Sequence, residues 1–479
     1  MHSLLATNLD YLRGRAAAAD VRDPQLAELW QAALAGDGEV LRISLQRTVF
    51  CLSLPSGKWL LKIYHPRRPW ERARRLLRSA PAVREAENWQ LLAHRLNIEL
   101  PILVEQMQPA LGLFARPFWQ GRSVSTALDS PTCFKTVAKG LARLHHHHWS
   151  DRDLSADDLL FADAYDGQVL PLDLGHAKVG LMKPSPEMVY RDLQNFIASI
   201  PVKYAQLAAT EFLRDSLHGA WLKDYSQEKL VKRSIRQRTG QAWKRSRRCL
   251  RTVSDFERVD RSSIRRNFAA PAPSSEVAVV LVKSGPRSST QKHADAAWKF
   301  YPRSGAVQKL RKQILLGPAC LAFRKLYFLE LLGFEVAAPQ AWHATHDGEW
   351  LATTWLSGTP PKASQLPQIA TFLARLHVHG VGLRDAKPQN FIVDNNANGA
   401  PTLYLIDADG IRPQLRNPWR DLARVLAECE VQSELHHLCS RAYLQTWKRM
   451  IGTPAPWSSA EIEQKTARFA AYFRDLLAK

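Results

Sequence analysis

Residues 141–161 read LARLHHHHWSDRDLSADDLLF, and the first five letters of this stretch recur in LARLHVHGVGLRD at residues 373–385. The two copies start 373 − 141 = 232 positions apart. In both, an Arg-Asp pair follows, and its aspartate (Asp153 or Asp385) stands eight residues after the histidine of LARLH. A repeat on this scale determines the fold, so the whole chain has to be searched for further copies.

Five more pairs of short motifs occur in the same order in both halves. They are WLLKIY at 59–64 and WKFY at 298–301, helical patterns ending at Pro101 and Pro339, FWQG at 118–121 and WLSG at 355–358, VLPLDLG at 169–175 and LIDADG at 405–410, and YRDL at 190–193 and WRDL at 419–422. Matched residues are separated by 229 to 238 positions throughout. Collinear matches at a nearly constant separation predict a tandem duplication of one domain.

Composition narrows the class of protein. The chain has 479 residues, 46% of them hydrophobic and 23% charged, which is typical of a globular protein of two or three domains. No apolar run approaches the roughly 18 to 20 residues that span a bilayer, and the N-terminus lacks the layout of a signal peptide. The six cysteines form no C-x-x-C pair. These features predict a cytoplasmic protein with reduced, metal-free thiols.

Each half contains the same succession of polar residues. Lys62 and Lys299 stand in short apolar runs with strand character, and Glu85 lies in a helical pattern that follows Lys62. The LARLH helix leads into a loop, RDLSADDLLF or RDAKPQNFIV, and then into an apolar strand that ends on Asp173 or Asp407. Phosphoryl transfer needs these groups: a cation on the nucleotide phosphates, oxygen ligands for magnesium and a carboxylate near the attacking hydroxyl.

The second half matches the catalytic loop of kinases in its spacing. Asp385 would accept the hydroxyl proton, and Asn390, five residues later, would bind Mg²⁺. Lys387 would touch the transferring phosphate, and Asp407 would be the second metal ligand. Lys299 would hold the phosphates of ATP.

The first half places other residues at the same points. Asp153 would be the base, Asp158 and Asp173 the Mg²⁺ ligands, and Lys62 the phosphate anchor paired with Glu85. Aspartate at 158 in place of asparagine keeps an oxygen ligand and adds a negative charge. Two later aspartates, Asp192 and Asp421, are expected to be buried and to brace the catalytic loops from a helix.

Both halves resemble the kinase-like fold, specifically the small bacterial kinases that phosphorylate heptose or Kdo sugars of the lipopolysaccharide inner core. The motifs that carry this resemblance are LIDAD at 405–409, LDLGHA at 172–177, the RDL helices, the absence of an APE segment, and the basic stretch WKRSRRCLRTVSDFERV at 243–259. It covers roughly residues 40–265 and 275–475. It implies an α+β fold of two tandem protein-kinase-like domains, each with a small β-rich N-lobe and a mainly helical C-lobe.

Three departures from the pattern are visible. Neither SLQRTVFCL at 44–52 nor VVLVKSGPRSS at 279–289 forms the glycine-rich loop that covers ATP in protein kinases. In the second half, Ala322 stands where the helix glutamate belongs, and Glu330 would lie one face away, so Lys299 is expected to lack its usual partner. In the first half, Ser155-Ala156 replaces the Lys-Pro of the loop.

A basic stretch lies between the halves. Residues 223–266 contain 15 Lys and Arg against 5 Asp and Glu, and the whole chain has a formal net charge of +21. We interpret residues 1–222 and 275–479 as kinase-like domains and 223–274 as a basic helical tail and linker. The charge indicates an anionic partner, and no nucleic-acid-binding motif accompanies it. Two interpretations of the stretch stay open. One is a solvated helical face with a linker. The other is docking on an anionic membrane surface or on phosphorylated lipid A and core sugars, with Trp243 and its neighbouring cations at the interface.

The resulting hypothesis is an ATP- and Mg²⁺-dependent phosphotransferase at the inner face of the inner membrane. Its acceptor would be a sugar hydroxyl on a lipopolysaccharide core or lipid A precursor, and the family resemblance implies that the sugar is a heptose. Two alternatives stay open. One is a non-catalytic pseudokinase that serves as a scaffold for envelope assembly. The other is a kinase for a protein or for a small molecule such as an aminoglycoside.

Overall fold

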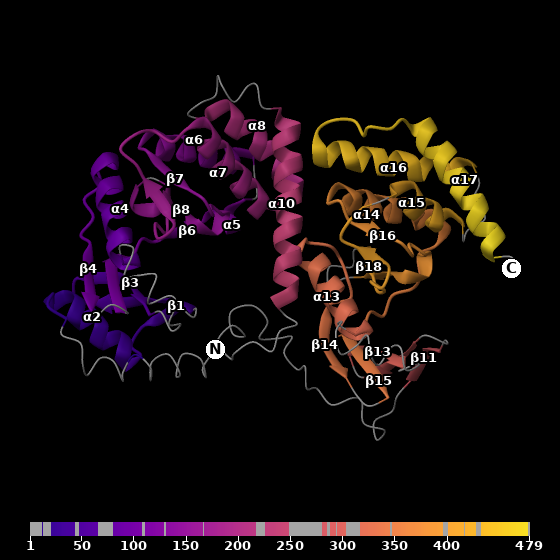
Figure 1. The fold of residues 1–479 in the computed structure, drawn as a ribbon, viewed down its shortest axis with the longest axis horizontal. Coiled ribbons are helices and arrows are strands. Elements are labelled where there is room, and N and C mark those ends of the chain that lie inside the picture. Colours follow the sequence, from indigo (N-terminus) through magenta and orange to yellow (C-terminus); the bar gives the residue numbers. More distant parts are fainter. Residues whose placement is uncertain are drawn as a thin grey trace. The chain divides into compact units, whose positions relative to one another are not determined.

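The computed structural model shows a mixed α/β protein whose described residues gather into two compact units (Figure 1). One unit is built from described residues within 1–200 and 207–231, and the other from those within 201–206, 232–252 and 264–479. The structure describes residues 12, 21–43, 47–65, 80–107, 111–128, 131–165, 167–216, 226–248, 280–284, 288–293, 295–302, 317–344, 347–395, 401–415, 417–427 and 433–477. Five-stranded sheets combined with many helices agree with the α+β class expected from the sequence.

The first unit contains an antiparallel sheet in the order β1-β2-β3-β5-β4. Its strands are β1 (Glu39–Ile43), β2 (Arg47–Leu54), β3 (Gly57–Tyr64), β4 (Leu103–Met107) and β5 (Leu111–Pro117). Helix α2 (Pro24–Ala35) starts at Asp23, whose side chain accepts a hydrogen bond from the Leu26 amide at 2.8 Å. Helix α4 (Pro81–Leu96) also begins with proline at its first position and ends at Asn97, which is left-handed.

Alternation along β3 separates the core of this sheet from its polar face. Trp59, Leu61 and Ile63 are buried in one cluster with Leu29 and Trp30 of α2. Side chains of a strand alternate between the two faces. The even-numbered residues of β3, Lys62 among them, therefore point to the opposite face, against which α4 packs. The apolar cluster thus fixes the register that presents the lysine to α4.

The rest of the first unit is mainly helical with short strands. Its elements are β6 (Gly121–Ser123), α5 (Val124–Ala127), α6 (Pro131–His146), β7 (Trp149–Asp151), β8 (Leu159–Ala162), β9 (Gln168–Pro171), β10 (Ala177–Val179), α7 (Pro186–Ser199) and α8 (Ala205–Asp215). Strands β6, β8 and β9 form one sheet, and β7 pairs with β10. In Figure 1 the five-stranded sheet lies at one end of this unit and α6 and α7 at the other.

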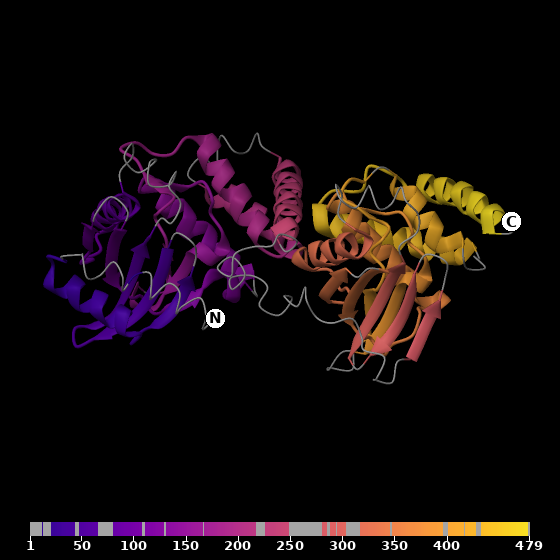
Figure 2. The same cartoon turned by 60° about the horizontal axis from the view of Figure 1, so that its bottom comes forward.

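The second unit contains a sheet with the corresponding order, β11-β12-β13-β15-β14. Its strands are β11 (Val280–Ser284), β12 (Ser289–His293), β13 (Ala296–Pro302), β14 (Pro339–Ala344) and β15 (Gly348–Thr354), and helix α13 (Pro318–Leu331) packs on it. Figure 2 shows these strands running alongside one another. Trp298 packs with Ala341 and Ala352 on one face, so Lys299 points to the other.

The remaining elements of the second unit are again short strands and helices. They are α14 (Leu366–Val378), β16 (Gly382–Leu383), β17 (Phe391–Asn395), β18 (Pro401–Leu405), β19 (Ile411–Arg412), α15 (Pro418–Ala427), α16 (Ser433–Ile451) and α17 (Ser459–Leu477). Strand β16 pairs with β19, and β17 with β18.

The repeated LARLH motif has a structural role in each unit. Its histidine lies in the last turn of a helix, α6 or α14, beside the aspartate of the RDL motif: His145 Nε2 is 3.4 Å from Asp192 Oδ2, and His377 Nε2 is 3.1 Å from Asp421 Oδ2. The same carboxylate oxygens accept hydrogen bonds from the amides of Asp151 (3.0 Å) and Leu383 (2.7 Å), just before the loops that contain Asp153 and Asp385. The motif recurs because each loop is held by a buried His-Asp pair.

Helix α10 (Gln227–Arg248) carries the described part of the basic stretch. Trp243, which we expected at a membrane interface, instead packs edge-on against Phe328 of α13, with ring centroids 5.2 Å apart. The guanidinium of Arg324 lies over the same indole at 3.5 Å. The tryptophan therefore anchors the helix to the second unit, and that expectation was wrong. Among the described residues, no helix is long and apolar enough to cross a membrane.

Candidate functional site

In the second unit, Lys299 on β13 lies at the centre of a cluster of carboxylates. Its Nζ is 2.9 Å from Asp407 Oδ2 and 2.9 Å from Asp409 Oδ2. Burial favours a lower pKa for Lys299, but the two carboxylates outweigh it and raise that pKa above its ordinary value. The lysine therefore stays charged.

Asp409 is a site residue that the sequence analysis missed. Besides pairing with Lys299, it accepts a hydrogen bond from the hydroxyl of Tyr301 at 3.1 Å, and its backbone carbonyl accepts one from Lys325 Nζ at 2.6 Å. Ala322, at the position of α13 that corresponds to Glu85 on α4, is buried and provides no carboxylate. The lysine nevertheless has a second carboxylate partner, which comes from the turn after β18 and not from the helix.

The loop that follows β16 in the second unit holds Asp385 between two cations. Asp385 Oδ1 lies 3.5 Å from Lys387 Nζ and 3.6 Å from Nε of Arg424 on α15. The side-chain amide of Asn390 donates to the carbonyl of Asp385 at 2.7 Å. This bond fixes the amide nitrogen, so that the amide oxygen of Asn390 is the atom left to serve as a metal ligand.

Backbone pairing brings the loop and the strand-end aspartate together. Phe391 of β17 pairs with Leu405 of β18, and the amide of Ile406 donates to the carbonyl of Asn390 at 2.9 Å. Asn390, just before β17, and Asp407, just after β18, therefore lie at the same end of this strand pair. On the other side, the amide of Arg384 donates to the carbonyl of Gly410 at 2.9 Å. Together these contacts place Asp385, Asn390, Asp407 and Lys299 in one neighbourhood.

The first unit builds a tighter cluster around Lys62. Its Nζ is 2.5 Å from Glu85 Oε1 and 3.1 Å from Asp173 Oδ1. Tyr64 donates its hydroxyl hydrogen bond to the other oxygen of Glu85. Arg47 on β2, which the sequence analysis did not single out, reaches Asp173 Oδ2 at 2.5 Å. Two cations thus face two carboxylates.

This neutral cluster shifts the ionisation of its members. Burial alone would raise the pKa of Asp173, but Lys62 and Arg47 hold it well below its ordinary range. Burial, followed by the charge of Glu85, raises the pKa of Tyr64 well above its usual value. Asp173 is consequently a carboxylate at every pH of interest, and its two oxygens are already engaged by cations.

The loop of the first unit has different surroundings. Asp153 is exposed, and its amide donates to Asp151 Oδ1 at 2.9 Å. Asp158 caps a short 3-10 turn: its Oδ2 accepts from the amide and the hydroxyl of Ser155, at 3.0 and 2.6 Å. Burial raises the pKa of Asp158, and the nearby charge of Asp173 adds to the shift.

The donor set of the second unit fits Mg²⁺. This ion prefers oxygen ligands, and proteins commonly hold it with one or two side chains together with phosphates of the substrate. Asn390 and Asp407 provide such a pair. Within the described ranges, no group of three or more His, Cys, Asp and Glu side chains is arranged to hold a metal by itself.

Comparison with known proteins gives structural similarity only. No protein-family model matches the chain, and no curated protein is detectably similar in sequence. A complex of WaaP with acyl carrier protein is similar over 42% of this chain and 90% of the WaaP chain, with 15% identity and a TM-score of 0.28. WbdD is similar over 40% of this chain and 45% of its own, with 18% identity and a TM-score of 0.27. A further WbdD structure, described as a bifunctional kinase-methyltransferase, has 17% identity, a TM-score of 0.26 and coverage of 39% and 43%.

Proposed function

We propose that the protein is an ATP- and Mg²⁺-dependent phosphotransferase whose second unit performs the reaction. The observation that carries the proposal is the convergence described above: a strand lysine on two carboxylates, with a loop aspartate and asparagine joined to the same turn through backbone hydrogen bonds. Phosphoryl transfer depends mainly on positioning and on charge stabilisation, and this arrangement supplies both.

Each residue of the second unit has a chemical role in this proposal. Lys299 binds the phosphates of ATP, and Asp385 accepts the proton of the acceptor hydroxyl as the new bond to phosphorus forms. Lys387, beside Asp385, contacts the transferring phosphate. Asn390 and Asp407 would hold Mg²⁺, whose charge would balance that of the phosphates. Asp409 positions Lys299, because it pairs with the lysine and with Tyr301 at the same time.

The first unit is proposed to be a second kinase-like domain with Lys62 and Glu85 as its phosphate anchor and Asp153, Asp158 and Asp173 as its base and metal ligands. Its closed cluster supports a weaker or non-catalytic role for this unit. Asp173 would have to exchange Arg47 and Lys62 for a metal ion, and such an exchange breaks partly buried ion pairs. The chain would then combine one transferring domain with one that binds or regulates.

The acceptor is proposed to be a sugar hydroxyl, that of a heptose, on a lipopolysaccharide core or lipid A precursor. Support comes from the sequence motifs and from charge. Six cationic residues of α10 are exposed: Lys229, Arg233, Arg236, Lys244, Arg245 and Arg247. Cations near an anionic leaflet contribute about 1 kcal/mol each. A peripheral position at the inner face of the inner membrane would bring the protein to a membrane-anchored substrate.

The test is transfer of labelled phosphate. The full-length protein is incubated with Mg²⁺, γ-labelled ATP and lipopolysaccharide that lacks core phosphate, and the labelled sugar is identified by mass spectrometry. We expect label on a core sugar with the unmodified protein and with Asp394→Asn, a matched control on β17, but not with Asp385→Asn. Label on an added protein or aminoglycoside and none on lipopolysaccharide would reject this acceptor.

The alternative of a non-catalytic scaffold makes a different prediction in the same experiment. It is favoured by the closed ion cluster of the first unit, whereas the carboxylates around Lys299 in the second unit are more exposed. A scaffold would transfer no label to any acceptor, with or without Asp385. The comparison of the unmodified protein with Asp385→Asn therefore separates the two functions.

A further inference from the structure

The loop between β10 and α7 of the first unit, residues 180–185, presents two large apolar side chains to solvent. Leu181 is 89% exposed and Met182 is 83% exposed, more than any other large hydrophobic residue that the structure describes. Single exposed apolar residues are common on protein surfaces. Two neighbours exposed to this degree, however, contribute almost nothing to the core, so their apolar surface is available to a partner.

Both ends of this loop are fixed, so the exposed pair has a defined place. The amide of Gly180 donates a hydrogen bond to the carbonyl of His148 at 3.0 Å. At the other end Pro184 is buried, and the side chain of Ser185 caps α7 by accepting a hydrogen bond from the amide of Met188 at 3.4 Å. A short loop held at both ends has little conformational freedom left to lose when it binds a partner.

The second unit has a loop at the corresponding place. This loop follows β19, and the amide of Leu415 donates to the carbonyl of Gly380 at 2.7 Å, as Gly180 does to His148. The two acceptors, Gly380 and His148, each stand three residues after the histidine of LARLH. The fold therefore provides both units with a loop that is fixed in the same way.

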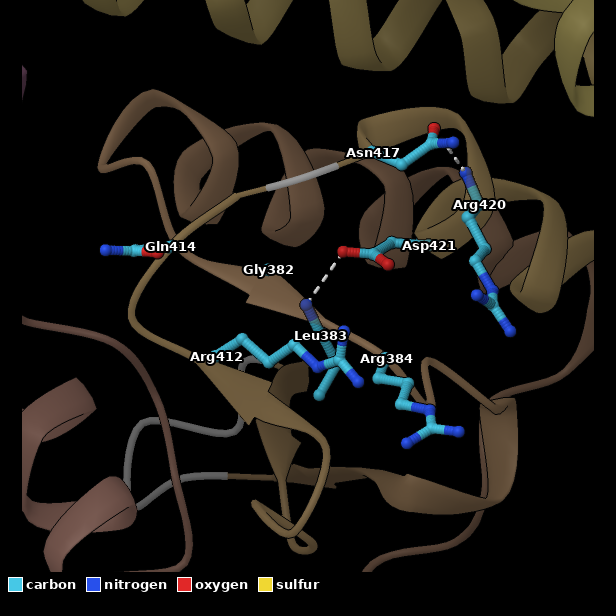
Figure 3. A pocket seen from close by; sticks show the side chains of 8 residues that line it. All are labelled: Gly382, Leu383, Arg384, Arg412, Gln414, Asn417, Arg420 and Asp421. Carbon is cyan, nitrogen blue, oxygen red and sulfur yellow. Dashed lines mark hydrogen bonds between the residues drawn. The ribbon is translucent and has the colours of Figure 1, made fainter.

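The surfaces of the two loops differ. Leu415 is half-buried, and a Cβ atom added to Gly382 would lie 3.7 Å from its Cδ1. Figure 3 shows Gln414 and Asn417 of the same loop, whose amide side chains line a cavity together with Arg412. The exposed apolar pair is thus a property of the first unit's sequence and not a consequence of the fold.

Two lysines flank the apolar pair. Lys178 on β10 and Lys183, directly after Met182, are both exposed. The stem of a lysine lies readily along apolar surface while its ammonium group reaches polar surroundings. Anionic phospholipid headgroups attract such cations. Apolar side chains between cations therefore match a surface that is anionic on the outside and apolar beneath.

The size of the exposed surface favours a bilayer over a protein as the partner. A stable protein–protein interface buries about 800 Å² on each partner, from roughly 20 to 30 residues. Two side chains provide only a small part of that area. A side chain inserted among acyl chains, by contrast, leaves water without needing a matching surface on the partner.

We propose that the loop at 180–185 inserts Leu181 and Met182 into an anionic phospholipid bilayer, with Lys178 and Lys183 at the headgroups. The inference rests on the proposed function in one respect: a membrane-anchored acceptor gives the chain a use for a unit that holds it at the bilayer. It differs from the attraction of the α10 cations, which is electrostatic only, because it adds an apolar anchor.

Binding is measured by sedimentation of the full-length protein with vesicles of phosphatidylcholine and phosphatidylglycerol, without nucleotide. Leu181→Ser combined with Met182→Ser should weaken binding about tenfold or more, because the apolar side chains no longer enter the hydrocarbon. This difference should persist at high salt, since salt screens charges and not apolar insertion. Leu91→Ser, at a leucine on α4 that is 43% exposed, is the matched control and should leave binding unchanged.

The lysines provide a second prediction. Lys178→Gln combined with Lys183→Gln should weaken binding about tenfold at low salt and less at high salt. Unchanged binding in the double serine variant, an equal loss with Leu91→Ser, or no binding of the unmodified protein overturns the proposal. Analytical ultracentrifugation covers the remaining case: a dimer that dissociates in the double serine variant would assign the loop to a contact between copies, and the proposal fails.

The vesicle experiment keeps this inference distinct from the proposed function, because it requires neither nucleotide nor acceptor. Binding that depends on Leu181 and Met182, in a protein that transfers no phosphate, would support the loop and reject the kinase. Phosphate transfer by a protein whose vesicle binding ignores these two side chains would reject the loop alone.

Discussion

Lys62 and Lys299 both form ion pairs with carboxylates, but the two clusters differ in how deeply they are buried. In the first unit the side chains of Lys62 and Glu85 are 4% and 0% exposed, and Arg47 adds a second cation. In the second unit Asp407 and Asp409 are 31% and 47% exposed, with Lys299 between them and Lys325 beside Asp409. One cluster is buried and the other is open to solvent. An open cluster leaves its carboxylates accessible to a metal ion, whereas a buried one mainly stabilises the fold.

The origin of the difference is an exchange between two positions. A Cβ atom added to Gly175 would lie 3.2 Å from Asp173 Oδ1, 3.4 Å from the Tyr64 hydroxyl and 3.8 Å from Glu85 Oε2. Asp409 stands at this point of the second unit, two residues after Asp407. Its carboxylate contacts Lys299 and Tyr301. These residues correspond to Lys62 and Tyr64, which Glu85 contacts in the first unit. The first unit thus has a glutamate on the helix, Glu85, and a glycine in the turn, Gly175. The second unit has Ala322 and Asp409 at the corresponding positions.

The largest expected effect concerns stability. Glu85→Gln removes one of the two carboxylates that face the buried Lys62 and leaves it only Asp173, which it shares with Arg47, so the change should cost the first unit about 3 kcal/mol. Asp409→Asn at the exposed counterpart should cost at most about 1 kcal/mol. Peptide-resolved hydrogen exchange during urea unfolding measures each unit separately. Similar losses for both variants would contradict the difference in depth.

The next effect concerns catalysis. Asp407→Ala should reduce phosphotransfer roughly a hundredfold or more, because a metal ligand stabilises the charge of the transition state. Asp173→Ala, the matched change in the first unit, should leave the rate within about twofold, since its carboxylate is occupied by cations. Steady-state transfer assays with both variants measure this. A larger loss with Asp173→Ala would mean that the first unit is the transferring one.

A pH effect should distinguish the units as well. Burial raises the pKa of Asp151 from 3.8 to about 7 and also raises that of Asp192. Between these values the folded state binds more protons than the unfolded state. The stability of the first unit should therefore fall as the pH rises from about 4 to 7, by roughly 2 kcal/mol or more, and change little above that range.

The matched position in the second unit is Leu383, which does not titrate. Asp151→Leu should accordingly flatten the pH dependence of the first unit, as followed by hydrogen exchange at several pH values. A slope that persists unchanged in this variant would show that another group is responsible.

The smallest effect tests the exchange itself. Glu85→Ala should destabilise the first unit, and adding Gly175→Asp should recover about 1 kcal/mol, because the new carboxylate can reach Lys62 and Tyr64. A denaturant series on the two variants provides the comparison, and a Gly175→Asp single variant serves as the control. No recovery in the double variant would show that the position of Asp409 does not substitute for a helix glutamate.

The sequence predicted the strand lysines, the loop residues and the strand-end aspartates because each follows a strand or helix boundary at a characteristic spacing. It could not predict Asp409 as a partner of Lys299. The LIDADG motif shows an aspartate where the first half has Gly175, but it does not show which side chain this aspartate contacts. Arg47 and Arg424 were missed for the same reason: their contacts cross between elements far apart in the chain. The placement of Trp243 failed because charge alone does not say which face of a helix packs against the protein.

The most direct test is the number of nucleotides bound per chain. Isothermal titration calorimetry of the full-length protein with Mg²⁺ and a non-hydrolysable ATP analogue should give one site. Binding should be lost in Asp407→Ala and kept in Asp173→Ala. Two equivalent sites, or a single site that disappears with Asp173→Ala and survives Asp407→Ala, would contradict the assignment of phosphotransfer to the open cluster around Lys299.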